Sequence, residues 1–461
     1  MKVYDQDNTV AAIATPPGEG GIGIIRISGP SSFRILTKIF KPKSNPDQIK
    51  SHRLYFGEII DPSNNYIVDE AIFSYMKAPN SYTREDVVEI NCHGGYVVLQ
   101  KTLEIVLREG AREAGPGEFT KRAFLNGRID LSQAEAVIDV IRSKTEAALK
   151  SAAAQLKGML KKEVETLKDE LAYSLALIET YIDFPEEDIE PESMEQIKGR
   201  LFNASKKLQD LIDSYDEGRI LRDGIYVVIA GVPNVGKSSL MNALLMEKRV
   251  IVTSVPGTTR DTIEEVVNIN GIPVNLIDTA GIRDTEDIVE SEGIKKTIEK
   301  LNKSDMVLYM LDERGVKHKD LEILRSIKNK KVIVIINKVD LLEVNKIKNI
   351  TSELNGYICV AVSAVSGSGL DKLKDLIHST ILVKKTGTEN NKVISRKRHK
   401  IAMERAVLSI ERAMNGMEKG LSVELISIDI KDAIDKIGEI VGETTPDHIL
   451  DLIFNEFCIG K

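Results

Sequence analysis

The spacing of apolar and polar positions changes along the chain. In residues 1–120 it predicts a small α/β unit. Two short apolar runs, Thr9 to Ala14 and Ile22 to Ser28, are separated by a turn rich in proline and glycine. Such runs between turn residues are typical of strands. A helical pattern follows from Pro30, and another covers Tyr96 to Arg108, directly after Gly94-Gly95.

Helical spacing takes over from Leu131 onwards. Ser132 and Glu135 have the spacing of a capping box, which predicts the start of a helix. Apolar residues then recur every three or four positions, which predicts one face of a long helix; they are Leu156, Leu160, Val164, Leu167, Leu171, Leu175, Ile178 and Ile182. Further helices are expected over Met194–Tyr215, Ser395–Glu418 and Ile428–Ile440, and a last one is expected to start at Thr445-Pro446.

Between these helical stretches, short apolar runs alternate with helical ones. The runs are Ile225–Ala230, Val274–Ile277, Met306–Leu311, Val332–Ile336 and Ile358–Val362. This alternation predicts a mostly parallel sheet with helices on both faces. We therefore expect a multi-domain α/β protein, in which an α/β domain at 218–383 is inserted into an all-α domain built from residues 121–217 and 384–461.

Composition limits the class of protein. With 461 residues, 42% of them hydrophobic and 29% charged, the chain is typical of a soluble globular protein of about three domains. No apolar run is long enough for a membrane span, and the acidic start is not a signal peptide. Three cysteines without metal-ligand spacing fit a reducing cytoplasm. The net charge of −7 argues against a protein that binds nucleic acid over its whole surface, but it permits a local basic patch. Residues 396–400 form one such cluster, although a cluster of this kind is more often the solvated start of a helix.

The strongest chemical signal is the loop from Gly231 to Ser239, which has the P-loop spacing G-x-x-x-x-G-K-S between an expected strand and an expected helix. Glycines let backbone N–H groups point inward, and the helix N-terminus attracts phosphate. We expect Lys237 to reach the β- and γ-phosphates and to take part in catalysis, and Ser238 to bind Mg²⁺. The expected phosphate-binding residues are Asn234, Val235, Gly236, Lys237, Ser238 and Ser239.

Four further motifs follow in the order that a GTPase requires. Asp278-Thr279-Ala280-Gly281 would place a carboxylate near Mg²⁺ and an N–H group near the γ-phosphate. The carboxylate of Asp340, in Asn337-Lys338-Val339-Asp340, can accept two hydrogen bonds from guanine that adenine cannot donate. Ser363-Ala364 fits the loop that contacts guanine O6, and Gly257-Thr258-Thr259 lies where a switch loop is expected, with Thr259 as a second Mg²⁺ ligand. Together these motifs predict GTP as the ligand.

One position departs from the common GTPase scheme. Ile282 stands where a water-positioning glutamine often follows the D-x-x-G motif. The nearby carboxylates Asp284, Glu286, Asp287 and Glu290 could orient water instead. On the residues alone, however, a solvated switch segment is the more common explanation of such a cluster.

Together with both ends of the chain, these motifs resemble the MnmE family, also called TrmE, of bacterial tRNA-modification GTPases. The resemblance extends over essentially the whole chain and is carried by Ala14 to Gly23, Asp183-Phe184-Pro185, Gly257 to Asp261 and Phe457 to Lys461. It implies a homodimer whose GTPase domains pair when GTP and K⁺ are bound. It also implies that Glu290 is the catalytic glutamate, acting through water, and that K⁺ is held by Asn234, Thr253, Val255 and Thr258, in a nucleotide-contacting segment that includes Ser254 and Pro256.

The resemblance further implies that the N-terminal domain mediates dimerisation and binds 5-formyl- or 5,10-methylene-tetrahydrofolate through Arg26, Glu89, Arg128 and Lys461. Family members often have lysine where this chain has Arg128. Cys458 would lie near the folate as a catalytic residue, although a small buried hydrophobic role is as common for cysteine. The implied reaction is shared with an FAD-dependent partner, MnmG, and adds an aminomethyl or carboxymethylaminomethyl group to C5 of the wobble uridine in certain tRNAs.

Two other functions remain open at this point. A ribosome-assembly GTPase shares the P-loop and the Gly257–Asp261 loop, but it should carry an RNA-binding module with a G-x-x-G clamp, and no such motif follows Leu382. A helical scaffold with an inactive GTPase domain is disfavoured by the intact motifs.

Overall fold

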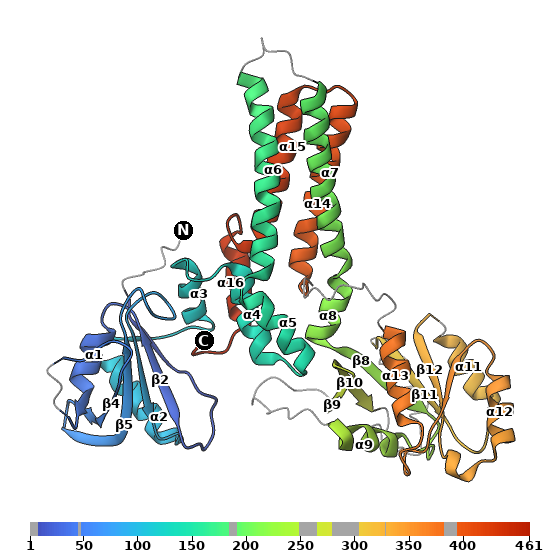
Figure 1. Ribbon diagram of the computed structural model, residues 1–461. Helices are drawn as coiled ribbons and strands as arrows, with labels where there is room; N and C mark the ends of the chain where they lie inside the picture. Colours follow the sequence, from blue (N-terminus) through green and yellow to red (C-terminus); the bar gives the residue numbers. More distant parts are fainter. Residues whose placement is uncertain are drawn as a thin grey trace, which may run out of the picture. The chain divides into compact units, whose positions relative to one another are not determined.

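The computed structural model describes residues 8–44, 48–183, 191–248, 265–278, 304–327, 329–381 and 394–461 (Figure 1). The chain divides into two compact units. One comprises Met1–Ile138, Lys161–Lys168 and Asp435–Lys461, and the other comprises Asp139–Leu160 and Asp169–Ile434. The domain limits expected from the sequence, at residues 120, 217 and 383, remain predictions.

The first unit is built on a sheet of seven described strands in the order β3-β4-β5-β6-β2-β1-β7. All neighbouring strands are antiparallel except β1 and β7. The strands are β1 (Val10–Ile13), β2 (Gly23–Ser28), β3 (Phe40–Pro42), β4 (Leu54–Asp61), β5 (Tyr66–Met76), β6 (Val87–Cys92) and β7 (Arg112–Glu113). The expected strands that became β1 and β2 are confirmed, whereas β3, β4, β5 and β7 were not predicted.

Two helices, α1 (Ser32–Ile39) and α2 (Tyr96–Arg108), pack against this sheet. Ile25, Ile27 and Ile90 are fully buried in the core that the helices and sheet share. Because side chains alternate along a strand, Arg26 and Glu89, which are paired across β2 and β6, lie on the opposite face. That face is where the first unit can present polar groups to a ligand.

Three more helices complete the first unit's core: α3 (Glu118–Leu125), α4 (Leu131–Arg142) and α16 (Asp447–Asn455). The predicted capping box at Ser132 is wrong. Asp130 Oδ1 accepts the Gln133 N–H at 3.0 Å, and the Ser132 hydroxyl donates to the same carboxylate at 2.6 Å. Thr445 does not cap α16 either, because its hydroxyl donates to Glu439 O at 2.8 Å and Pro446 occupies the N-cap.

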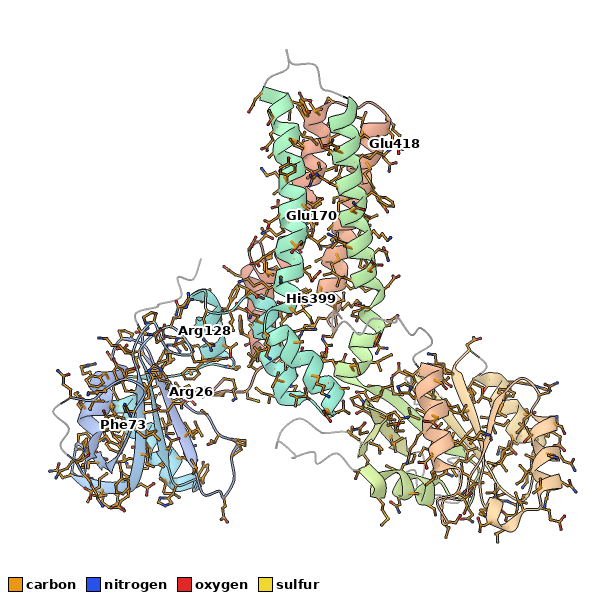
Figure 2. The ribbon with its side chains drawn as sticks, in the orientation of Figure 1. Arg26, Phe73, Arg128, Glu170, His399 and Glu418 are labelled. Carbon is orange, nitrogen blue, oxygen red and sulfur yellow. The ribbon has the colours of Figure 1, made fainter. Side chains whose placement is uncertain are left out.

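Six further described helices from both sides of the P-loop region lie wholly or partly in the second unit. They are α5 (Glu146–Leu156), α6 (Met159–Asp183), α7 (Pro191–Asp213), α8 (Tyr215–Asp223), α14 (Lys397–Glu418) and α15 (Val423–Val441). Gly158, with φ of +83°, separates α5 from α6, so Leu156 is not on the long helix as predicted. α7 packs along α14, and Lys198 pairs with Glu418 at 3.0 Å, while Lys207 pairs with Glu170 of α6 at 2.5 Å (Figure 2). Segments far apart in sequence thus share one helical core.

The second sheet has six described strands in the order β13-β12-β11-β8-β10-β9, all parallel except the edge strand β9. They are β8 (Ile225–Gly231), β9 (Glu265–Ile269), β10 (Ile272–Asp278), β11 (Met306–Leu311), β12 (Lys331–Ile336) and β13 (Ile358–Ala361). Helices α9 (Lys237–Lys248) and α13 (Leu370–Ile381) bury Leu240 and Leu373 on one face. Helices α11 (His318–Ser326) and α12 (Val344–Glu353) bury Leu324 and Ile350 on the other. The predicted parallel sheet covered on both faces is confirmed.

Within the described ranges, no helix combines the length and the apolar character needed to cross a bilayer.

Candidate functional site

The carboxyl ends of the parallel strands bring most of the predicted GTP motifs to one edge of the second sheet. β8 ends in the P-loop, β10 ends at Asp278, β12 is followed by Asn337, and β13 is followed shortly by Ser363. In open α/β sheets, ligands bind outside this edge. The sheet therefore gathers motifs that are more than 100 residues apart in the sequence.

The P-loop surrounds the ammonium group of Lys237. Lys237 Nζ donates to Gly231 O at 3.0 Å and to Val232 O at 3.1 Å, so the ammonium group is held against the start of the loop. Asn234 is exposed and has a left-handed backbone, with φ of +66°. Ser238 and Ser239 are exposed in the first turn of α9, where helix N–H groups favour an anion.

Asn337 joins the P-loop to the loop that begins at Ser363. Its side chain is buried, donates from Nδ2 to Val235 O at 2.8 Å, and accepts the Ala364 N–H on Oδ1 at 3.1 Å. A Cβ atom on Gly236 would overlap the Asn337 amide, so only glycine permits this close approach. The amide thus fixes three of the predicted loops against one another.

Lys338 and Asp340 continue the same motif. Lys338 Nζ lies 3.2 Å from Asp312 Oδ2 and 3.2 Å from Glu313 Oε2. Burial opposes the charge, but the hydrogen bonds to Glu313 and Asp312 prevail and raise the pKa of Lys338. Asp340 lies exposed in the short 3-10 helix Val339–Leu341, where its carboxylate is accessible to the base of a nucleotide.

A second group of predicted residues meets in the first unit. Arg26 Nε pairs with Glu89 at 2.8 Å, and Arg26 Nη1 donates to Gly460 O at 2.9 Å. The Arg26 guanidinium lies 5.6 Å from the Phe119 ring and 5.9 Å from the Tyr82 ring. The guanidinium of Arg128 lies 4.7 Å from the same Tyr82 ring (Figure 2).

The C-terminal tail docks beside Arg26. Phe119 N–H donates to Lys461 O at 3.1 Å, and Gly117 N–H donates to Cys458 O at 3.4 Å. Gly460 has φ of +91°, and a Cβ there would overlap Ile13 O, so the tail fits only with glycine at this position. The structure thus brings Arg26, Glu89 and the Lys461 backbone together. Arg128 is linked to them through Tyr82, and the Cys458 side chain is exposed.

Comparisons with known proteins identify the family. Residues 131–458 match the model of the MnmE helical domain, and residues 9–128 match that of the GTP-binding protein TrmE N-terminus. The chain is 49% identical to tRNA modification GTPase MnmE of Geobacter metallireducens, covering 99% of each chain. It is 50% identical to the protein of the same name from Geobacter sulfurreducens, again over 99% of each chain. The chain belongs to the MnmE family.

The resemblance inferred from the motifs is therefore confirmed, and full-length similarity favours the MnmE family over a ribosome-assembly GTPase. Among solved structures, the chain is also similar to Era of Aquifex aeolicus bound to GDP·AlF4⁻. That match is 29% identical and covers 40% of this chain and 67% of the other, with a TM-score of 0.29. At so low a score, the GTPase-type fold is better judged from the strand order of the second sheet.

Several residues that the MnmE resemblance or the motifs single out lie outside the described residues. They are Thr253, Ser254, Val255, Pro256, Gly257, Thr258, Thr259, Thr279, Ala280, Gly281 and Glu290. Asp278 ends β10, and only its backbone is described. Glu290 as the catalytic residue, Thr259 as an Mg²⁺ ligand, and Thr253, Val255 and Thr258 as K⁺ ligands remain predictions.

The structure also reveals residues near the nucleotide motifs that the sequence reasoning missed. Asp312 is buried directly after β11 and binds Arg314 at 2.7 Å, while Arg314 Nη2 donates to Pro233 O of the P-loop at 3.2 Å. Burial alone would raise the pKa of Asp312, but hydrogen bonds from Arg314 and Lys338 lower it to about 2. The position of Asp312 at the end of a central strand was the available signal.

At the second group, Tyr82 and Phe119 were missed because their role depends on contacts across the unit. The Tyr82 hydroxyl lies 3.0 Å from Thr120 Oγ1, which holds the ring within reach of both arginines. Across the described part of the chain, no group of three or more His, Cys, Asp or Glu residues could hold a metal ion.

Proposed function

We propose that this protein binds and hydrolyses GTP and uses that cycle in the modification of tRNA wobble uridines. The observation that carries the proposal is the meeting of the P-loop, the Asn337–Asp340 motif and the Ser363-Ala364 loop at one sheet edge, held by the Asn337 amide. The name shared by its full-length relatives, tRNA modification GTPase, supplies the biological reaction class.

In this proposal, each group at the sheet edge has a separate task. Backbone N–H groups at the start of α9 and the Lys237 ammonium bind the phosphates, and Asp340 accepts hydrogen bonds from guanine. Ser238, with Thr259 and the nucleotide's own phosphate oxygens, fits the all-oxygen coordination that Mg²⁺ prefers. Mg²⁺ would supply charge stabilisation to the departing phosphate.

The absence of a glutamine after Gly281 motivates the next part of the proposal. Glu290 positions the attacking water, and K⁺, held by Asn234, Thr253, Val255 and Thr258, supplies the positive charge that an arginine provides elsewhere. The exposed side chain of Asn234 supports this, because an amide oxygen is a suitable K⁺ ligand. Pairing of GTPase domains in a homodimer would enclose the site.

The group around Arg26 fits a folate donor set. Glu89 and its ion-pair partner Arg26 can bind the polar edge of a pterin, while Arg128 and Lys461 suit the carboxylates at the glutamate end. We propose that 5-formyl- or 5,10-methylene-tetrahydrofolate binds here and supplies the one-carbon unit. The exposed Cys458 thiol is the proposed reactive side chain in the tail.

The modification itself is proposed to need a second protein, the FAD-dependent MnmG. The product is an aminomethyl or carboxymethylaminomethyl group at C5 of the wobble uridine. The experiment that tests the GTPase part is hydrolysis by the full chain in K⁺ and in Na⁺ at equal ionic strength. Much faster turnover in K⁺ is expected, and equal rates in the two salts would contradict the K⁺ assignment.

A further inference from the structure

A basic pocket lies beside the Arg26 group in the first unit. It has a volume of about 470 Å³ and is lined by His52, Met76, Pro79, Asn80, Ser81, Tyr82, Arg84 and Arg128. This volume is within the range of about 300–1,000 Å³ that is typical of small-molecule sites. The described residues that line it include two arginines and a histidine, and none of them carries a carboxylate.

Both arginines in this pocket are held by neutral partners. Arg84 Nη1 donates to Asn126 O at 2.9 Å, and Asn126 Nδ2 in turn donates to Thr83 O at 2.7 Å. Arg128 stacks on the Tyr82 ring. Across the described ranges, neither guanidinium lies within ion-pairing distance of a carboxylate, and both side chains are exposed.

The acidic residues nearest in sequence are engaged elsewhere. Glu85 pairs with Arg122 at 3.0 Å and accepts the Ser28 hydroxyl at 2.7 Å. Asp86 accepts the Tyr75 hydroxyl at 3.0 Å and the Ala78 N–H at 2.9 Å. An anion entering the pocket therefore meets cations whose charge no neighbouring acid neutralises, which is the arrangement that favours a carboxylate ligand.

Tyr82 connects this pocket to the proposed folate site. The Tyr82 ring lies 5.9 Å from the guanidinium of Arg26 and 4.7 Å from the guanidinium of Arg128. A folate held at Arg26 and Glu89 ends in a glutamate whose γ-carboxyl is the point where further glutamates are attached. The arginines of the pocket can therefore pair with the carboxylates of such an extension.

We propose that the pocket binds the additional γ-linked glutamates of a polyglutamylated tetrahydrofolate, with Arg84 and Arg128 as their carboxylate partners. This inference rests on the proposed folate function and adds the form of the substrate. An RNA phosphate backbone is the less suitable occupant, because RNA-binding surfaces use an extended basic stripe, whereas the pocket lining offers only two arginines and a histidine.

The test compares binding of mono- and triglutamyl 5-formyl-tetrahydrofolate to the full chain by isothermal titration calorimetry at low salt. The triglutamate is expected to bind about tenfold more tightly, which corresponds to two partly exposed charge pairs. Arg84→Ala is expected to reduce this preference to about threefold or less without changing monoglutamate affinity, because Arg84 is not among the proposed contacts of the folate itself. Rising salt should weaken the preference in the wild-type chain.

Arg53→Ala is the matched control, because Arg53 is exposed beside His52 but does not line the pocket. It should keep the full preference for the triglutamate. Equal affinity of the wild-type chain for both folates, or an equal loss of both in Arg84→Ala, overturns the inference while leaving folate binding intact. Failure of the monoglutamate to bind at all contradicts the proposed folate function instead. A loss of tRNA affinity in Arg84→Ala, with folate preference unchanged, would identify RNA as the occupant and overturn the proposal.

Discussion

Replacing Asn337 with alanine tests whether its amide holds the nucleotide loops together. The substitution removes the bond to Val235 O at 2.8 Å and the bond from Ala364 N–H at 3.1 Å. Asn337 is only 2% exposed, so water cannot easily replace it. The predicted consequence is loss of stability even before any nucleotide binds.

The magnitude follows from the two backbone groups that lose their partner. A buried polar group left without a hydrogen bond costs about 1–3 kcal/mol, so the free energy of unfolding should fall by about 2–6 kcal/mol for the two groups. For a domain of this size, that corresponds to a decrease in Tm on the order of 5–20 °C. GDP affinity should fall as well, because the loops that bind phosphate and base lose their shared brace.

The assay is thermal unfolding of the full chain without nucleotide, together with titration of a fluorescent GDP analogue. Asp340→Ala is the control, because Asp340 is exposed and is proposed to contact only the base. It should lose GDP affinity with almost no change in Tm. If Asn337→Ala also unfolds at the wild-type temperature and resembles Asp340→Ala in affinity, the bracing argument is wrong.

Three other substitutions probe separate parts of the structure. Gly460→Ala should displace the tail, because a Cβ would overlap Ile13 O. Folate affinity measured by calorimetry should then fall at least about tenfold, while GTP turnover is unchanged. A parallel loss of folate affinity and GTP turnover would point to general misfolding. Burial alone would raise the pKa of Glu118, but hydrogen bonds from Arg112, the Gly115 N–H and Arg122 lower it. Its contribution is therefore complete above its ordinary pKa of 4.5 and lost as pH falls through the lower folded value. Glu118→Gln should cost about 2 kcal/mol by urea unfolding at neutral pH and progressively less in acid, and a cost that does not change with pH would exclude the charge as its cause. Glu290→Ala should abolish most GTP hydrolysis in K⁺ and spare GTP binding, and near-normal turnover would exclude Glu290 as the catalytic residue.

The parallel strands of the second sheet were predictable because their signals are local, whereas β9 was not predicted. β11 and β12 are buried on both faces, so Met306–Leu311 and Val332–Ile336 read as continuous apolar runs. The P-loop and Asn337–Asp340 motifs were predictable for the same reason, since their spacing is read directly from the chain. Their convergence then follows from the parallel sheet.

Edge and half-exposed strands gave a weaker signal. β4 and β5 alternate buried with exposed positions and include charged residues such as Glu58 and Glu70, so no apolar run marks them. β9 and β10 are joined at Asn270-Gly271, with φ of +49° and +92°. That dipeptide is a strong hairpin signal, so the turn between β9 and β10 is readable from the sequence.

The predicted start of α4 was wrong because two nearby residues can each cap the helix. Asp130 and Ser132 both have side chains that can cap a helix, and the carboxylate accepts the backbone bond while the hydroxyl donates to it. Tyr82 could not be assigned from pattern at all, and for Asp312 the pattern offered only its position directly after a central strand. Their roles arise from partners such as Arg128, Arg26 and Arg314, which only the folded chain brings into contact.

The central claim is that GTP hydrolysis by this chain serves the modification of tRNA wobble uridines. The most direct measurement is mass spectrometry of tRNA nucleosides from cells that lack the chain, complemented with the wild type or with Lys237→Ala. The account predicts that C5-aminomethyl and carboxymethylaminomethyl uridines disappear without the chain, return with the wild type and stay absent with Lys237→Ala. Unchanged wobble nucleosides in cells that lack the chain would contradict it.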